Sequence, residues 1–243
     1  MVVGGGPAGV ELAGGLAELV AGLPAGHPGR AARILLLERG ERLLPAYPDG
    51  VARRAAALLG AAGVEVRTWA AVAGVDGAGV RLPGERIAAR TVLWAAGIGA
   101  AALAQDLDAP VDGSGRLEVR PDLSLPAWER VFAVGDVASI ARGAGRVPGT
   151  AQAAAQAGRH AAANALHVLA GERTEPFRCA SLGRLAAVGR STFVGHVGPL
   201  ELPPVVAGLV ARAARAWWLW PGRARASLGV PAPRRVLRAP ANA

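Results

Sequence analysis

The sequence predicts an α/β protein built on a Rossmann-like, three-layer dinucleotide-binding domain. Three observations predict this fold class. Val2 and Val3 lead into a glycine-rich turn, an Ala/Leu-rich stretch typical of a helix follows the turn, and Arg33–Glu38 is a second apolar segment that ends in an acid. Strand, turn, helix and strand in this order are typical of the βαβ unit that binds dinucleotides.

The glycine-rich turn has the spacing G-x-G-x-x-G, at Gly4, Gly6 and Gly9. The first glycine permits a tight turn, the second lets a pyrophosphate approach the backbone, and the third lets the helix pack on the strand. The phosphates would lie at the helix N-terminus, where free N–H groups and the helix dipole favour anions. A chain with 34 glycines can carry this spacing by composition alone, so its place between strand and helix is what favours dinucleotide binding.

The acid that ends the second predicted strand is Glu38, 29 residues after Gly9. A carboxylate at this place hydrogen-bonds a ribose 2′-hydroxyl and repels a 2′-phosphate, so the sequence favours NAD(H) over NADP(H). The alternative is a solvated acid at the end of a strand.

The elements that follow complete a domain over residues 1–97. A helix fits Asp49 to Ala62 because apolar residues recur on one face, and Val64–Val66 is a short strand. Short alternating segments broken by turn residues predict a small antiparallel meander. Thr91–Trp94 is then the last strand of the domain.

Composition excludes several classes of protein. The chain has 243 residues, of which 52% are hydrophobic and 19% charged, which excludes an extended disordered or fibrous protein. Cys179 is the only cysteine and the four histidines are widely spaced, so we expect neither a disulfide nor a metal site. The N-terminus has no signal-peptide pattern, and a reduced, cytoplasmic compartment fits.

The positive charge lies in the C-terminal part of the chain. Seventeen arginines balance seventeen acids up to Phe177, whereas ten arginines and one acid follow from Arg178 onward. Residues 203–243 form a basic, Trp-rich tail in which Val205–Trp220 predicts an amphipathic helix. We expect this helix to lie on an anionic membrane surface, at the inner face of the cell membrane, and we expect no nucleic-acid partner. The alternative is a helix packed on the protein's own core, followed by a disordered arginine tail.

Three segments carry a resemblance to a known family. Gly4–Leu16, Thr91–Gly97 and Val131–Asp136 together resemble the two-dinucleotide-domain flavoproteins of the pyridine nucleotide-disulfide oxidoreductase type. Within them, Val147–Gln156 is similar to the Ala-Gln-x-Ala-x-Gln stretch of the type II NADH:quinone oxidoreductases. The resemblance implies that residues 98–202 are the C-terminal part of an FAD-binding domain whose N-terminal part is lacking here.

The resemblance also implies a reaction and the residues that perform it. Hydride would pass from NADH to FAD, and electrons would pass on to a quinone or another small acceptor. Glu11, Gln152 and Gln156 would be catalytic, because the family places them beside the nicotinamide, the flavin ring and the quinone. The residues implied to bind the cofactors are Gly4, Gly6, Gly9, Glu38, Gly97, Gly135, Asp136, Ala151 and Gln152. For Asp136, which the resemblance places on the flavin ribityl chain, the alternative is a loop acid that caps the next helix.

A second reading of the chain stays open. It is a truncated or non-catalytic nicotinamide-nucleotide-binding fragment or subunit, which needs a second chain to complete the flavin site. A half-domain leaves a sheet edge and an apolar face uncovered, which favours pairing with a second chain or a homodimer.

Overall fold

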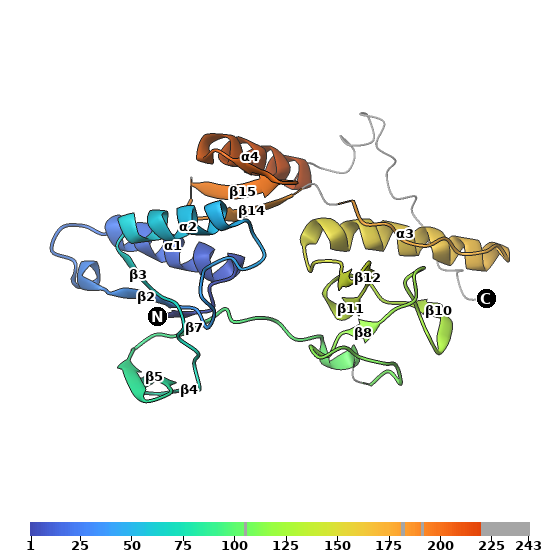
Figure 1. Cartoon of the computed structure of the whole chain (residues 1–243), viewed down its shortest axis with the longest axis horizontal. Coiled ribbons are helices and arrows are strands. Elements are labelled where there is room, and N and C mark those ends of the chain that lie inside the picture. The colour runs from blue at the N-terminus through green and yellow to red at the C-terminus, as the bar shows by residue number, and fades with distance from the viewer. Residues whose placement is uncertain (105, 181–182, 191, 220–243) are drawn as a thin grey trace, which may run out of the picture. The chain divides into compact units, whose positions relative to one another are not determined.

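A parallel four-stranded sheet forms the centre of the first of two units into which the chain divides (Figure 1). Unit 1 comprises Met1–Trp94 and the residues from Arg184 onward, and unit 2 comprises Ala95–Gly183. The computed structural model describes residues 1–104, 106–180, 183–190 and 192–219. The sheet has the order β3-β2-β1-β7, with β1 Val2–Val3, β2 Ile34–Leu37, β3 Val64–Arg67 and β7 Leu93–Trp94.

Unit 1 has the predicted three layers around this sheet. Helices α1 (Pro7–Ala21) and α2 (Asp49–Ala61) lie over one face, where Leu36 of β2 packs beneath Gly9 of α1. The antiparallel meander covers the other face, on the opposite side from the helices in Figure 1. Its strands are β4 Gly74–Asp76, β5 Gly79–Leu82 and β6 Glu85–Ala88, and a short 3₁₀ helix, η1 Pro28–Ala31, follows α1. The predicted Rossmann-like α/β class is confirmed.

Alternation along the strands explains the layers, because successive side chains of a strand point to opposite faces. Val3, Leu35 and Leu37 form one buried cluster with Val80 of the meander. The intervening Leu36 is fully buried on the helix side. Strand β2 is thus apolar throughout because both of its faces are covered, as is usual in parallel sheets.

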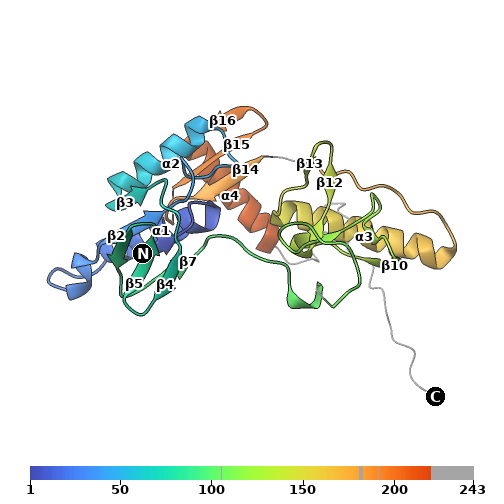
Figure 2. The ribbon, with the colours of Figure 1, turned by 60° about the horizontal axis from the view of Figure 1, so that its bottom comes forward.

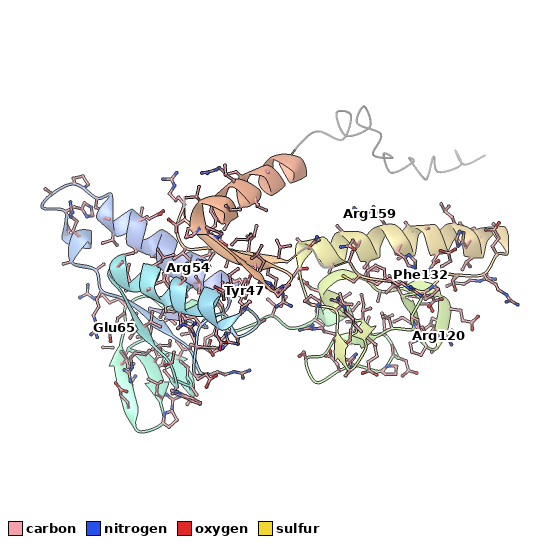
Figure 3. The ribbon with its side chains drawn as sticks, turned by 45° about the horizontal axis from the view of Figure 1, so that its top comes forward. Tyr47, Arg54, Glu65, Arg120, Phe132 and Arg159 are labelled. Carbon is pink, nitrogen blue, oxygen red and sulfur yellow. The ribbon has the colours of Figure 1, made fainter. Side chains whose placement is uncertain are left out.

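A second, antiparallel sheet of unit 1 comes from the C-terminal part of the chain. Its strands are β14 Arg184–Ala187, β15 Phe193–Val197 and β16 Leu200–Leu202, and α4 Pro204–Leu219 packs on β15 (Figure 2). Two side chains, both labelled in Figure 3, donate hydrogen bonds to this sheet. The hydroxyl of Tyr47, just before α2, donates to the Leu185 carbonyl at 3.1 Å, and Arg54 of α2 donates to the Leu202 carbonyl at 3.1 Å.

The position of this sheet differs from the domain boundaries expected from the sequence. The expected division puts Arg184–Leu202 with the flavin-domain part and ends the first domain at Gly97. In the structure the sheet belongs to unit 1, which ends its first segment at Trp94. The close approach of two glycines explains the packing, because a Cβ on Gly14 of α1 would lie 2.6 Å from the backbone nitrogen of Gly189.

Unit 2 combines one long helix with short strands. Its core gathers Leu117, Leu123, Leu125 and Ile140 around Ala157 of α3. The helices are η2 Ala102–Ala104, η3 Gly135–Val137 and α3 Ala151–Ala170, and the strands are β8 Leu117–Glu118, β9 Ser124–Leu125, β10 Trp128–Phe132, β11 Ala138–Ser139, β12 Ala141–Arg142 and β13 Gly145–Arg146. Strand β10 ends at Phe132, shortly before the turn at Gly135.

The predicted tail helix is present as α4, and Trp220 with the arginines beyond it lies outside the described residues. Ala207 on its inner side is buried, whereas Val205 and Leu209 are 74% and 57% exposed. Of the helices in the described part of the chain, none combines the length and apolar character needed to cross a membrane.

Candidate functional site

The glycine turn of unit 1 has the geometry that its spacing predicts. Gly4 has a φ of +109°, and its N–H donates to the Leu37 carbonyl at 2.8 Å, which ties the turn to β2. A Cβ on Gly9 would lie only 1.7 Å from the Gly4 carbonyl oxygen, so α1 packs directly on the turn. A Cβ on Gly6 would meet no atom within 4 Å. The turn is therefore closed at Gly9 and open at Gly6.

The N-terminus of α1 lies behind this open position. Gly6 is the N-cap residue and supplies no side-chain hydrogen bond, and Pro7 begins the helix. The N–H groups of the first turn of a helix have no partner within the helix, and an anion is a natural acceptor for them. The open side of the turn is thus suited to a phosphate group.

Glu38 connects the glycine turn to the loop after β2. Its carboxylate accepts from the Gly5 N–H at 2.6 Å and from the Gly40 N–H at 2.7 Å, and the residue is 9% exposed. Each carboxylate oxygen has a second lone pair and can accept a further hydrogen bond. The acid therefore already holds the turn in place while keeping capacity for a ligand hydroxyl.

Glu11 lies on α1 and lines a pocket of about 190 Å³ within unit 1. The apolar wall of the pocket comes from β14, β15 and α4, and its other charged residues are Arg190 and Arg212. Both oxygens of Glu18, two turns further along α1, accept from the Arg190 N–H, at 2.8 and 2.7 Å. The helix that carries Glu11 is thus fixed to the turn that carries Arg190.

The sequence predicts no role for either arginine of this pocket. Arg190 follows Gly189 in the turn before β15, and Arg212 lies within the predicted tail helix Val205–Trp220, so neither belongs to a motif. Their common position beside Glu11 depends on the packing of α1 on β14 and of α4 on β15, and α1 lies far from these elements in the sequence.

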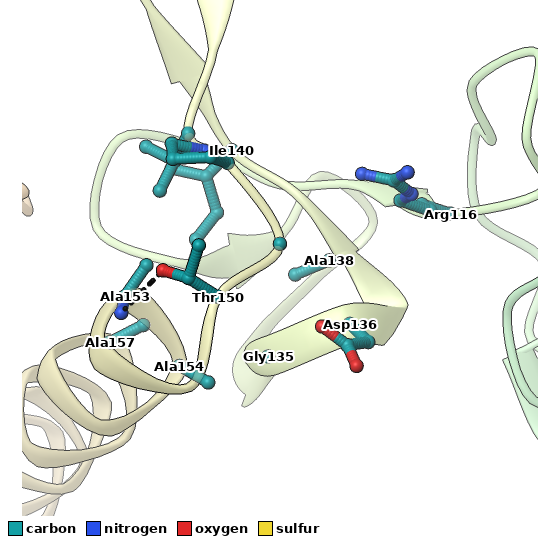
Figure 4. Close-up of a pocket in the computed structure, with 12 residues that line it drawn as sticks. Arg116, Gly135, Asp136, Ala138, Ile140, Thr150, Ala153, Ala154 and Ala157 are labelled. Carbon is teal, nitrogen blue, oxygen red and sulfur yellow. Dashed lines mark hydrogen bonds between the residues drawn. The ribbon is translucent and has the colours of Figure 1, made fainter. Parts of the chain in front are cut away.

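Unit 2 holds the second candidate pocket (Figure 4). Gly135 has a φ of +76° and begins the turn that presents Asp136. The pocket is also lined by Arg116 and by the start of α3, where the Thr150 hydroxyl accepts from the Ala153 N–H at 3.2 Å. A carboxylate, a guanidinium and a helix N-terminus therefore surround one hollow with small apolar walls.

Asp112 fixes the loop that carries Arg116. Its carboxylate accepts from the Ser139 hydroxyl at 2.6 Å and from the N–H groups of Ser114 and Arg116 at 2.8 and 3.1 Å. The hydrogen bond from Ser139 is the main reason why the pKa of Asp112 lies below its usual value. Because Ser139 belongs to β11, which directly follows η3, this acid joins two walls of the pocket.

The remaining predicted residues also lie in unit 2. Ala151 begins α3, and Gln152 and Gln156 lie one turn apart on it. The side-chain amide of Gln156 is bonded to the backbone of Ala180, donating to its carbonyl at 2.9 Å and accepting from its N–H at 3.0 Å. Gly97 has a φ of +119° in the loop after β7. Among the residues that the structure describes, no three His, Cys, Asp or Glu side chains are grouped as a metal site would require.

Comparisons with known proteins agree with this arrangement. The family model described as "Pyridine nucleotide-disulphide oxidoreductase" matches residues 1–158. The type II NADH:quinone oxidoreductase Ndh of Mycobacterium tuberculosis is 36% identical over 225 residues, which are 86% of this chain and 48% of the relative. The type II NADH:quinone oxidoreductase of Staphylococcus saprophyticus is 30% identical, over 81% of this chain and 51% of the relative. The chain thus spans about half the length of these curated relatives.

Solved structures share the fold. NDH2 from Plasmodium falciparum in complex with NADH superposes with a TM-score of 0.74 at 15% identity, over 92% of this chain and 62% of that one. An FAD-dependent pyridine nucleotide-disulphide oxidoreductase from Desulfovibrio vulgaris gives a TM-score of 0.61 at 20% identity, over 80% of this chain and 47% of that one. At these identities the likeness concerns the fold alone.

Proposed function

Because the chain belongs to the pyridine nucleotide-disulphide oxidoreductase family, we propose that it serves as an FAD-dependent oxidoreductase. It would pass hydride from NADH to FAD and then electrons to a quinone-type acceptor, as the names of its relatives suggest. The observation that carries the proposal is the glycine turn, which is open at Gly6 and held by Glu38 within the region that matches the family.

The residues of unit 1 would bind the nicotinamide nucleotide. The pyrophosphate would lie against the N–H groups at the start of α1, where Gly6 leaves room for it. Glu38 would accept hydrogen bonds from ribose hydroxyls and disfavour a 2′-phosphate, which favours NAD(H). Gly4 and Gly9 would shape the turn. The contribution implied for Gly97 would come from unit 2, in the loop after β7.

The residues of unit 2 would bind the flavin nucleotide. Asp136 offers a carboxylate to ribityl hydroxyls, and a Cβ on Gly135 would meet its first neighbour only at 3.8 Å, so the backbone can be approached closely. Ala151 and Gln152, at the start of α3, would border the flavin ring. When bound, FAD supplies the capacity to accept a hydride and release electrons, and the protein supplies orientation and exclusion of water.

Glu11 of unit 1 and the two glutamines of α3 in unit 2 would take part in the reaction. Glu11 would orient the nicotinamide for transfer, in a pocket where Arg190 and Arg212 bring positive charge. Gln152 would border the electron acceptor, and Gln156 would act from one turn further along α3. Such roles need fixed geometry more than a strong base, because positioning lowers the barrier when the cofactors carry the chemistry.

The purified chain tests this proposal directly. We expect it to bind NADH in a fluorescence titration, and to reduce a quinone analogue when supplied with FAD. Glu11→Gln should leave the dissociation constant for NADH within twofold while slowing single-turnover reduction of the flavin by at least tenfold. NADH binding without retention of FAD would instead favour a nucleotide-binding subunit that needs a second chain. Absence of NADH binding would reject both readings.

We also propose that the protein lies on the inner face of the cell membrane. The outward side of α4 supports this, because Val205 and Leu209 are largely exposed. Co-sedimentation with vesicles containing an anionic phospholipid should fall several-fold when Val205→Ser and Leu209→Ser are combined. Neutral vesicles are the control for the need for anionic lipid. If the double variant sediments with the anionic vesicles as well as the unsubstituted protein does, the membrane assignment is contradicted.

A further inference from the structure

Helix α3 carries a row of polar side chains that bond the chain segment following it. Gln156, His160 and Asn164 are spaced by four residues, so they lie on one side of the helix. After the helix ends at Ala170, with Gly171 as its C-cap, the chain turns and runs back along α3 (Figures 1 and 2). All three side chains contact the backbone of this returning segment, residues 172–180.

The two amide side chains bond the segment in the same way. Asn164, which is fully buried, donates to the Glu175 carbonyl at 2.9 Å and accepts from the Glu175 N–H at 2.9 Å. Gln156 repeats this pair of bonds with Ala180, at 2.9 and 3.0 Å. Each amide thus satisfies both backbone groups of one residue, as a neighbouring peptide unit would.

The spacing of these contacts agrees with an extended segment. Gln156 and Asn164 are about 12 Å apart along the helix axis, at about 1.5 Å for each residue. The chain from Glu175 to Ala180 can span at most about 17 Å. His160 bonds the same Glu175 carbonyl as Asn164, at 2.8 Å, and its ring lies 5.4 Å from that of Phe177. The segment is therefore held at Glu175 and at Ala180, with the ring contact of Phe177 between them.

The geometry points to different roles for the two glutamines of α3. We propose that Gln156 is a positioning residue, which holds the segment ending at Ala180 against α3, and that Gln152 is the amide available to a ligand. The Gln156 amide already makes both bonds to Ala180, and its nitrogen also donates to the Gln152 carbonyl at 3.4 Å, so only its second oxygen lone pair is left for an electron acceptor. The role of Gln156 in holding the segment does not depend on the proposed function. The role of Gln152 in binding a ligand does rest on the proposed function.

The only cysteine of the chain provides a reporter for this contact. Cys179 precedes Ala180 directly and is half-buried, so release of the segment exposes its thiol further. The experiment measures the rate at which the native protein reacts with a thiol reagent such as 5,5′-dithiobis(2-nitrobenzoic acid). Gln156→Met keeps the length of the side chain and removes both hydrogen bonds, and Gln152→Met is the matched control one turn earlier.

We expect Gln156→Met to raise the labelling rate about tenfold. The reason is that the segment loses two hydrogen bonds, each near the lower end of the usual net strength, and is therefore released more often. Gln152→Met should stay within twofold of the unsubstituted protein. Gln156→Glu keeps an acceptor for the Ala180 N–H but no donor, so its rate should lie between the two. Equal labelling of Gln156→Met and the unsubstituted protein would overturn the positioning role.

Two further measurements separate this inference from loss of folding and from the proposed function. If Gln156→Met does not fold, hydrogen exchange of the Ala180 amide in the unsubstituted protein decides: protection supports the contact, and exchange at the rate of an unprotected peptide overturns it. In the quinone reductase assay, Gln152→Met should raise KM for the quinone without changing thiol labelling, whereas an unchanged KM would overturn the role of Gln152. Absence of any quinone reduction would reject the proposed function while leaving the labelling result valid.

Discussion

Two acids are implied to bind the cofactors, Glu38 in unit 1 and Asp136 in unit 2. They differ in the hydrogen bonds that the protein itself makes to their carboxylates. The carboxylate of Glu38 accepts two backbone N–H groups, from Gly5 and Gly40, and is nearly buried. For Asp136, the described residues supply no hydrogen bond to the carboxylate, which lines an open hollow beside Arg116. One acid therefore belongs to the structure of its turn, and the other is presented to the surroundings.

This difference indicates how each site is prepared for a ligand. In unit 1 the turn is fixed by the protein itself, so binding there costs little ordering of the backbone. In unit 2 the walls are fixed indirectly, through the bonds of Asp112 to Ser139 and to the loop that carries Arg116. Substitutions that break the unit 1 turn should therefore affect folding, whereas those around Asp136 should affect binding more than stability.

The largest expected effect separates two glycines of the same turn. Gly9→Ala would bring a Cβ to 1.7 Å from the Gly4 carbonyl oxygen, so α1 must move away from the sheet. We expect unit 1 to lose more than about 4 kcal/mol of stability, at the upper end of single substitutions. Gly6→Ala adds a Cβ with no atom within 4 Å and should leave the urea unfolding midpoint nearly unchanged.

NADH binding provides the second half of this test. Because the open side of Gly6 is where a pyrophosphate would approach, Gly6→Ala should weaken NADH binding at least tenfold in a folded protein. Full affinity of Gly6→Ala for NADH would contradict the placement of the pyrophosphate. A Gly9→Ala protein as stable as the unsubstituted one would contradict the close contact of α1 with the turn.

A smaller loss of stability is expected for Glu38→Gln, which replaces one oxygen of the carboxylate by an NH₂ group. This NH₂ group faces either the Gly5 or the Gly40 N–H. Leaving one buried donor without a partner costs about 1–3 kcal/mol, and we expect a loss of about 3 kcal/mol in urea unfolding at pH 7. Asp136→Asn is the comparison in unit 2 and should change stability by less than about 0.5 kcal/mol. Equal losses in the two variants would remove the distinction between the two acids.

The sequence predicted the local parts of this arrangement well. Periodicity placed α2 and the apolar β2, and the acid after β2 could be located because strands end where charged residues begin. It could not predict the partner of Gln156, which lies 24 residues away and is a backbone group with no signature of its own. It also missed that β14–β16 pack on unit 1, because the contact of Gly14 with Gly189 joins segments separated by most of the chain.

The smallest expected effect concerns the support of the unit 2 pocket and depends on pH. Ser139→Ala removes the hydrogen bond that contributes most to the lowered pKa of Asp112. A carboxyl group whose pKa is lower in the folded than in the unfolded protein stabilises the fold above its unfolded pKa, near 3.8, and this stabilisation disappears as the pH falls through the folded pKa. We therefore expect Ser139→Ala to lower the stability by about 1.5 kcal/mol at pH 7, the lower range for a bond to a charged group. Urea unfolding followed by circular dichroism should show the two proteins converging as the pH falls below 3.8. A difference that stays constant to the lowest pH would mean that Ser139 acts through packing rather than through the charge of Asp112.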